Sequence, residues 1–518
     1  MADTNGTGGT GGMGNGDATS KKASSSPGPK KPKPAPAAKK PKDKLTVARR
    51  NLRVIDGGGD EDVDRVIRTF ACTDTGNAER LVHKFGDRLR YVPAWREYLV
   101  HIGTHWQRDI CDIETNKLVK AMISEIEEEG RYEDTGGKKV LAKWRKQSES
   151  RGKRQAVIDL ACAEPGVACS QDVFDSDPWI LSVANGTLDL RTCELRPHDP
   201  KDLTTKCLPV AYDPRAGAPR FRRFMEEILP DKKVRDFVQR FLGYCLTGAV
   251  SERMFVIFLG GGSNGKTALI NAIQNVLGEY STVAASTLLT SRDKDQHPAE
   301  VAALFGVRLA VTSETKKGAS FDEEKVKRLT GSDVLTARRM RENFWTFRPT
   351  HKLLIASNHK PRVKDATSSF WDRVAIVPFD VRFSGKKVDR KLGAKLEEER
   401  EGILAWLVEG CRQWRTGGLA PPDAVMSATK EYREEEDIAG RFLNECYVPD
   451  PTKTSFMYTR DILERNKTWA AGFNFFPISA KDLAEKLRME PFECVATKRD
   501  GIAGWKGIKV KKKGEKDK

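Results

Sequence analysis

The chain has 518 residues, of which 38% are hydrophobic and 31% are charged, and its formal net charge is +17. This composition predicts a protein with an ordinary buried core and room for two to four domains. No apolar run approaches the roughly 18 residues of a membrane span, and the N-terminus lacks the apolar segment of a secretory signal. We therefore expect no contact with membranes and a cytoplasmic location, with the ten scattered cysteines reduced.

Most of the positive charge lies in two terminal segments. Residues 1–53 hold twelve Lys or Arg against three Asp, in a low-complexity sequence that predicts a disordered tail. Residues 509–518 hold six Lys against two acids, and 511–518 are interpreted as a basic tail. Such tails favour nucleic acid through counterion release. A solubilising tail without a specific partner is an equal alternative for the N-terminal segment.

Residues 80–245 are interpreted as one mixed α/β, mostly helical domain. Apolar periodicity predicts a short strand over 98–102 and helices over 118–129, 140–162 and 221–244. Between them, residues 180–190 carry Asn185-Gly186 flanked by two apolar runs, which is typical of a β-hairpin.

The most informative motif follows an apolar strand at residues 254–259. It matches G-x-x-x-x-G-K-[ST] and consists of Gly260, Gly261, Gly262, Ser263, Asn264, Gly265, Lys266 and Thr267. A helical period follows it as far as Leu277. Strand, glycine-rich loop and helix is the arrangement that surrounds a polyphosphate with backbone N–H groups. We therefore expect ATP here, with Lys266 at its β- and γ-phosphates and Thr267 holding Mg²⁺; a chance glycine-rich hairpin is the less favoured alternative.

Three further apolar strands are predicted, and two of them end in polar residues. The strand over 307–313 leads to Glu314, the predicted water-polarising base and second Mg²⁺ ligand, and the strand over 352–357 leads to Asn358. Parallel strands would gather both side chains with Lys266 at one edge of a sheet. Arg373 precedes its strand, over 374–379, and is interpreted either as an arginine finger on a neighbour's nucleotide or as a structural ion pair.

The segment 327–345 is rich in basic and aromatic residues. It predicts a hairpin with a basic turn, which suits single-stranded nucleic acid. The predicted contacts are Lys327, Arg328, Arg338, Arg339 and Arg341. For the aromatic residues, we favour a position of Phe344 or Trp345 in the core over stacking on bases.

Helical sequence continues to about residue 414, and a charged helix is predicted over 423–447. Residues 452–510 predict a small winged-helix module, with helices at 459–467 and 479–489 and two strands around 498–501. Lys498 and Arg499 on its wing are expected to contact DNA. The predicted parts are thus 1–53, 80–245, 246–415, 423–510 and 511–518.

The ordered motifs GGGSNGKT, SET, KRLTGSD, ARRM, SN and DRVAIVPF closely resemble those of superfamily 3 helicases of the phage/plasmid primase–helicase type, related to the poxvirus primase–helicase. With ANGTLDL upstream and RDGIAGWKGIKV downstream, the resemblance covers about residues 80–510. It implies an AAA+-like P-loop ATPase core with a parallel central sheet. It also implies a homo-hexamer that hydrolyses ATP, moves 3′ to 5′ on single-stranded DNA and unwinds duplex DNA in phage or plasmid-type replication.

Within the resemblance, Lys266 and Thr267 bind phosphate and metal, Glu314 is the Walker B acid, Asn358 is the sensor and Arg373 is the finger. Two positions depart from the family pattern: Ser313-Glu314 offers one carboxylate where a pair is frequent, and Asp372-Arg373 replaces a double arginine. The roughly 80 residues before the resembling region are too few for a primase, so we expect a helicase that works with a separate primase and polymerase. An origin-binding initiator that uses ATP as an assembly switch is the alternative, and a small-molecule kinase is disfavoured by the basic hairpin.

Overall fold

The structure is a computed structural model that describes residues 52–53, 67–68, 70–290, 298–313, 320–340, 342–363, 368–385, 388–473 and 475–511. The chain divides into two compact units at residue 69. In the first unit the described residues form two short antiparallel strands, β1 (Leu52–Arg53) and β2 (Ile67–Arg68). The tails predicted at 1–53 and 511–518 lie almost entirely outside the described residues.

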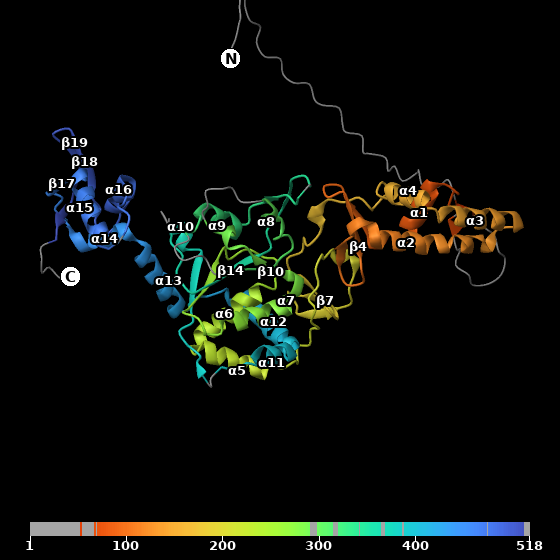
Figure 1. Cartoon of the computed structure of the whole chain (residues 1–518), viewed down its shortest axis with the longest axis horizontal. Coiled ribbons are helices and arrows are strands. Elements are labelled where there is room, and N and C mark those ends of the chain that lie inside the picture. Colours follow the sequence, from red (N-terminus) through yellow and green to blue (C-terminus); the bar gives the residue numbers. More distant parts are fainter. Residues whose placement is uncertain are drawn as a thin grey trace, which may run out of the picture. The chain divides into compact units, whose positions relative to one another are not determined.

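The second unit begins with four helices around a small sheet (Figure 1). The helices are α1 (Asp74–Phe85), α2 (Ile113–Ser124), α3 (Thr135–Ser148) and α4 (Arg151–Ala161), and the antiparallel strands are β3 (Leu89–Val92), β4 (Glu97–His101) and β5 (Trp106–Arg108). Leu81, Val100 and Val157 belong to their common core. The single helix predicted over 140–162 is wrong, because Ser150 has extended backbone and begins α4 as its N-cap.

A second small sheet and two helices lead into the central part of the chain. β6 (Ile180–Val183), β7 (Gly186–Asp189) and β8 (Glu194–Arg196) form an antiparallel meander, which confirms the predicted hairpin. The single helix predicted over 221–244 is instead α5 (Pro219–Ile228) and α6 (Lys232–Tyr244). Pro230 has no N–H to continue the helix, and the Lys233 amide donates to the Asp231 side chain at 2.8 Å to cap α6.

Helix α6 packs along α12 (Arg400–Gly417), which follows α11 (Leu392–Glu398). The two helices approach so closely that a Cβ on Gly243 would lie 2.2 Å from the backbone N of Cys411. Residues on both sides of the predicted domain boundary at 245 therefore share one core.

Five parallel strands form the central sheet in the order β10-β11-β14-β9-β15. They are β9 (Phe255–Leu259), β10 (Ser281–Ala284), β11 (Leu309–Ser313), β14 (Lys352–Ser357) and β15 (Val374–Pro378). This sheet confirms the predicted mixed α/β class and its parallel centre. Since all five strands run the same way, their carboxyl ends lie at one edge.

Alternate residues of β9, β11, β14 and β15 enter different cores. Val256 and Phe258 pack with α5, α6, α7 (Lys266–Leu277) and α12 on one face. Phe255 and Ile257 pack on the other face with α8 (Pro298–Ala302), α9 (Glu323–Thr330), α10 (Ser368–Trp371) and the hairpin of β12 (Leu335–Ala337) and β13 (Trp345–Phe347). Figure 1 shows α7 and α12 on the opposite side of the sheet from α8 and α9.

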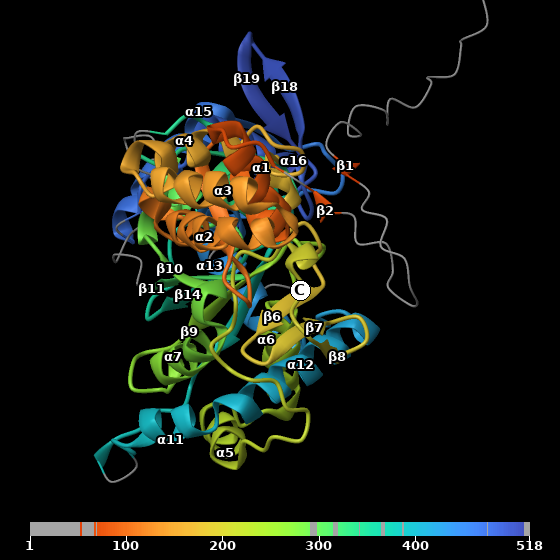
Figure 2. The ribbon, with the colours of Figure 1, turned by 90° about the vertical axis from the view of Figure 1, so that its right-hand side faces the viewer.

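The C-terminal part begins with α13 (Asp423–Glu436), which lies along the edge strand β15: the Ile376 amide donates to Thr429 Oγ1 at 3.0 Å. The helix predicted over 423–447 breaks at Asp437 and continues as α14 (Ile438–Cys446). The remaining elements are β16 (Tyr447–Pro449), β17 (Phe456–Tyr458), α15 (Thr459–Gly472), α16 (Ala480–Arg488), β18 (Val495–Arg499), β19 (Ile502–Lys506) and β20 (Ile508–Val510). Figure 2 shows the β18–β19 hairpin extending beyond α15 and α16.

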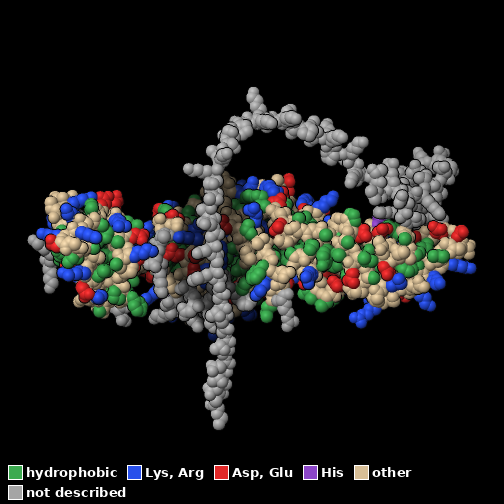
Figure 3. Space-filling model, turned by 90° about the horizontal axis from the view of Figure 1, so that it is seen from above, with side chains coloured by type: hydrophobic (Ala, Val, Ile, Leu, Met, Phe, Trp, Pro, Cys, Tyr) green, Lys and Arg blue, Asp and Glu red, His purple; other side chains and the backbone are tan. Residues whose placement is uncertain are grey.

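Acidic and basic side chains are interspersed on the face seen in Figure 3. All ten cysteines are unpaired. None of the helices in the described ranges combines the length and apolar character needed to cross a bilayer.

We predict that His351, next to β14, makes the fold sensitive to acid. Its side chain is buried, and this burial lowers its pKa from 6.5 to about 4. The unfolded chain takes up this proton at a higher pH than the folded chain, so the free energy of unfolding should fall between about pH 6.5 and pH 4, by up to about 3 kcal/mol. Urea unfolding across this range measures the effect. His351→Leu should flatten the slope, and an equal slope in wild type and variant would contradict the prediction.

Candidate functional site

The glycine-rich loop 260–265 joins β9 to α7 at the carboxyl edge of the central sheet. Gly262, Ser263 and Gly265 have left-handed backbone, with φ of 85°, 52° and 91°. Left-handed residues in a tight loop let successive backbone N–H groups face one concavity, which suits an anion. A Cβ on Gly265 would also lie 2.4 Å from Cγ2 of Ile228 on α5, so this position needs glycine for packing as well as for conformation.

The ammonium group of Lys266, the first residue of α7, lies over this loop. Its side chain is buried, and Nζ donates to Gly260 O at 2.6 Å, to Asn264 Oδ1 at 3.2 Å and to Asn358 Oδ1 at 3.1 Å. Asn264 in turn donates Nδ2 to Phe379 O at 3.2 Å, which ties the loop to the chain after β15. Thr267 is exposed in the first turn of α7. The structure thus brings together Lys266 and Asn358, which come from separate sequence motifs.

Strand β14 lies between β9 and β11, and this order places Asn358 beside the loop. Ser357 pairs with Leu259 at the end of β9, and Ala356 pairs with Ser313 at the end of β11. The strand that leads to Glu314 therefore ends at the same edge as the loop. Glu314 itself lies outside the described residues, so its role stays a prediction.

Arg373 directly precedes β15, so it lies at the amino-terminal ends of the strands, opposite the carboxyl edge that holds the glycine-rich loop. Its carbonyl accepts from the Phe255 amide at 2.8 Å, and its Nη1 donates to Thr330 Oγ1 at 3.0 Å. The length of β9 separates it from the loop of its own chain. Its role as a finger on a neighbour's nucleotide stays a prediction.

The tip of the β12–β13 hairpin presents side chains to solvent. Arg338 is exposed, and its guanidinium carbon lies 4.7 Å from the ring centroid of Phe344. Phe344 or Trp345 was expected in the core, and buried Trp345 confirms this, whereas Phe344 is 58% exposed. Phe344 lies beyond the last strand pair, Ala337 with Trp345, where no other layer covers it. Met340, which the sequence analysis did not single out, is also highly exposed.

Arg339 lies on the other side of the hairpin from Arg338. Its guanidinium carbon is 5.3 Å from the ring centroid of Trp345, and burial lowers its pKa. On α9, Lys327 Nζ is 3.7 Å from Glu323 Oε2, and Arg328 is exposed. Arg341 lies outside the described residues. Neighbouring side chains in an extended segment face opposite sides, and this alternation separates Arg338 from Arg339. The predicted DNA contacts did not take this alternation into account.

Lys498 and Arg499 end β18 and are exposed. The turn that follows them consists of Asp500 and Gly501, both with left-handed backbone, as a tight hairpin requires. The guanidinium carbon of Arg499 lies 5.8 Å from the ring centroid of Phe456. Both cations are therefore accessible to a partner.

Two family models match the chain. One is described as D5 N terminal like and matches residues 78–230. The other is described as a family of unknown function and matches residues 258–373, a range that contains the glycine-rich loop, Asn358 and Arg373. Together they cover the segments on both sides of α6.

Three curated relatives come from large DNA viruses. A "putative helicase" of Acanthamoeba polyphaga mimivirus is 26% identical over 319 residues, which are 57% of this chain and 33% of that protein. A "putative helicase" of Frog virus 3 is 28% identical over 306 residues, 55% of this chain and 30% of that protein. A "putative primase" of African swine fever virus is 23% identical over 348 residues, 62% of this chain and 36% of that protein. The matches span about a third of the length of these relatives.

Among solved structures, the C-terminal region of NrS-1 aligns with a TM-score of 0.47 and 11% identity. The alignment covers 82% of this chain and 96% of that region.

We predict that the loop tolerates a methyl group at Gly261 and not at Gly260. A Cβ on Gly260 would lie 2.3 Å from Asn264 Nδ2 and 2.4 Å from Phe379 O, whereas at Gly261 no atom lies within 4 Å. Gly260→Ala should therefore weaken the binding of Mg-ATP by about tenfold or more, and Gly261→Ala should change it by less than about twofold. Titration with a fluorescent ATP analogue measures both constants. Equal affinities would argue against ATP binding at this loop.

Proposed function

We propose that this chain, a relative of the primase–helicases of superfamily 3 type, is an ATP-hydrolysing helicase that moves on single-stranded DNA and separates duplex DNA during replication. One observation carries the proposal: Lys266 lies between the glycine-rich loop and Asn358 at the carboxyl edge of a parallel sheet. The names of the viral relatives support a role in replication.

The loop 260–265 is the proposed phosphate-binding loop. Three of the acceptors of the Lys266 ammonium are neutral oxygens, and the phosphates of ATP would offer it charged oxygens, which are stronger acceptors. The N-terminus of α7 adds positive potential at the same place. The donor set fits Mg²⁺, because the Thr267 hydroxyl and the Glu314 carboxylate are oxygen ligands. When bound, the ion would neutralise charge on the β- and γ-phosphates.

Hydrolysis needs a water molecule aligned with the γ-phosphate. Glu314 is the proposed base, and Asn358 is the amide that orients the water. Asn358 Oδ1 accepts from Lys266 in this structure, and a move of Lys266 onto phosphate would release this hydrogen bond. In a homo-hexamer, Arg373 of one subunit would stabilise the transition state on its neighbour.

DNA is proposed to bind the tip of the β12–β13 hairpin. Arg338 supplies a cation, and the exposed ring of Phe344 is available to stack on a base. Lys327 and Arg328 on α9 are the further basic residues proposed to contact DNA. The hairpin is inserted in the chain between β11 and β14, the strands that lead to Glu314 and Asn358, and this position supports the proposal that the nucleotide controls the DNA contacts. The 3′ to 5′ direction, the ring and a separate primase and polymerase belong to the proposal through the family resemblance.

We predict that Lys266→Ala lowers ATP hydrolysis at least about a hundredfold, because the mutant lacks the cation that neutralises the γ-phosphate. Single-stranded DNA should stimulate hydrolysis by the wild type and have no effect on the variant. Lys430→Ala, at an exposed lysine on α13, is the matched control and should retain the wild-type rate. Phosphate release measured with and without DNA provides the rates. ATP hydrolysis that is indifferent to DNA would favour an initiator in which ATP controls assembly.

We predict that Lys498 and Arg499 contact DNA phosphates. The double change Lys498→Ala/Arg499→Ala should reduce the slope of log K against log salt by up to about 2, since each lost phosphate contact removes about 0.9. Fluorescence anisotropy with duplex DNA at several salt concentrations measures the slope. Lys117→Ala/Lys120→Ala, on α2, is the control pair and should leave it unchanged. A wild-type slope in the wing variant would remove these residues from the DNA interface.

A further inference from the structure

An ion network joins the N-terminal sheet to the tip of the β12–β13 hairpin. Arg108, the last residue of β5, donates Nε to Glu97 Oε2 at 2.6 Å and Nη2 to Glu342 Oε1 at 3.0 Å. Oε2 of Glu342 is 3.6 Å from Nη1 of Arg339. The four side chains are 18% to 31% exposed, so water screens their charges only in part.

Aromatic rings support the same network. The guanidinium carbons of Arg108 and Arg339 lie 5.1 and 5.5 Å from the ring centroid of Trp95, and that of Arg339 also lies near Trp345. The centroids of Trp95 and Trp345 are 5.6 Å apart, and both rings are buried. Two cations beside one indole repel each other, so Glu97 and Glu342 supply the compensating charge. Packing and charge thus link the N-terminal sheet to the hairpin at one place.

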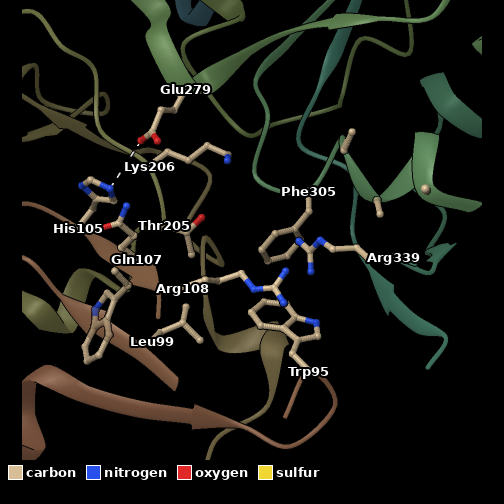
Figure 4. A pocket seen from close by; sticks show the side chains of 14 residues that line it. Trp95, Leu99, His105, Gln107, Arg108, Thr205, Lys206, Glu279, Phe305 and Arg339 are labelled. Atoms are coloured by element: carbon tan, nitrogen blue, oxygen red, sulfur yellow. Dashed lines mark ion pairs between the residues drawn. The ribbon is translucent and has the colours of Figure 1, made fainter. Parts of the chain in front are cut away.

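The network is incompletely satisfied. Nη1 of Arg339 and Oε2 of Glu342 are buried and have no hydrogen-bond partner within the described residues, because 3.6 Å is too long for a hydrogen bond. Arg108 and Arg339 line a cavity of about 440 Å³, and Figure 4 shows their guanidinium groups close together at its wall, beside Phe305. Unsatisfied buried groups favour a rearrangement that pairs them, and the cavity provides the space.

We propose that Arg108 and Glu342 couple the N-terminal sheet to the hairpin, so that movement of the hairpin during the ATP cycle is transmitted to residues 89–108. Neither side chain touches the nucleotide site, so they act as positioning residues. The purpose that we give to this coupling rests on the proposed function. The N-terminal sheet supports the hairpin while the hairpin pulls on DNA. Loss of the network leaves hydrolysis without DNA intact and lowers the stimulation of hydrolysis by DNA.

Hydrogen–deuterium exchange of the full chain tests the coupling without DNA. A non-hydrolysable ATP analogue should change exchange in both 335–347 and 89–108 of the wild type. In Glu342→Gln the response at 335–347 should persist, and the response at 89–108 should fall at least about threefold. Arg108→Gln should behave alike, and Glu114→Gln, in the exposed pair with Lys117 on α2, should resemble the wild type. No response at 89–108 in the wild type, or an equal one in wild type and Glu342→Gln, would overturn the proposal.

DNA-stimulated hydrolysis then separates positioning from binding. Glu342→Gln should lower the maximal stimulation about tenfold and leave the DNA concentration for half-stimulation within about twofold, whereas Arg338→Ala should raise that concentration. The double variant Arg108→Gln/Glu342→Gln should lose less than the sum of the two single losses, because each single variant already removes the bond between Arg108 and Glu342. Additive losses would contradict the pairing. If the wild type shows coupled exchange but DNA does not stimulate its hydrolysis, the helicase proposal fails and the coupling stands. If DNA stimulates hydrolysis but the exchange is not coupled, the coupling fails and the helicase proposal stands.

Discussion

The parallel pairing of β9 with β14 is the constraint on which the candidate site depends. It sets Leu259 opposite Ser357, so the glycine-rich loop and Asn358 leave the sheet at the same level, and Lys266 Nζ reaches Asn358 Oδ1 at 3.1 Å. A shift of one residue would turn the end of β14 to the other face of the sheet and break this contact. The apolar residues that alternate along both strands prevent such a shift, because each face enters a separate core.

The position of the β12–β13 hairpin in the chain links the candidate site to the surface that we propose for DNA. The β12–β13 hairpin is inserted between β11 and β14, whose ends flank the loop. Its inner side packs on the N-terminal sheet through Trp345 and Trp95, and its outer side exposes Arg338 and Phe344. The hairpin therefore contacts the central sheet, the N-terminal sheet and solvent. This arrangement suits an element that would move during the ATP cycle that we propose.

Local patterns in the sequence predicted the parallel sheet, the loop and the strand-end position of Asn358, because periodicity and glycine placement act over short distances. The break at Pro230 was readable from the sequence, since proline cannot donate within a helix. The exposure of Phe344 was not, because it depends on the absence of a covering layer. The contact of Arg108 with Glu342 joins residues 234 positions apart, and no local pattern indicates it. The roles of Glu314 and Arg341 remain predictions because both lie outside the described residues.

Strand separation by the purified chain is the most direct test of the central claim. Duplexes with a 3′ tail, a 5′ tail or no tail are incubated with Mg-ATP or with a non-hydrolysable analogue, and the displaced strand is measured. A helicase of the proposed direction should displace the strand of the 3′-tailed duplex with ATP and not with the analogue. ATP-dependent binding to these duplexes without displacement would contradict a helicase and favour an initiator that uses ATP for assembly.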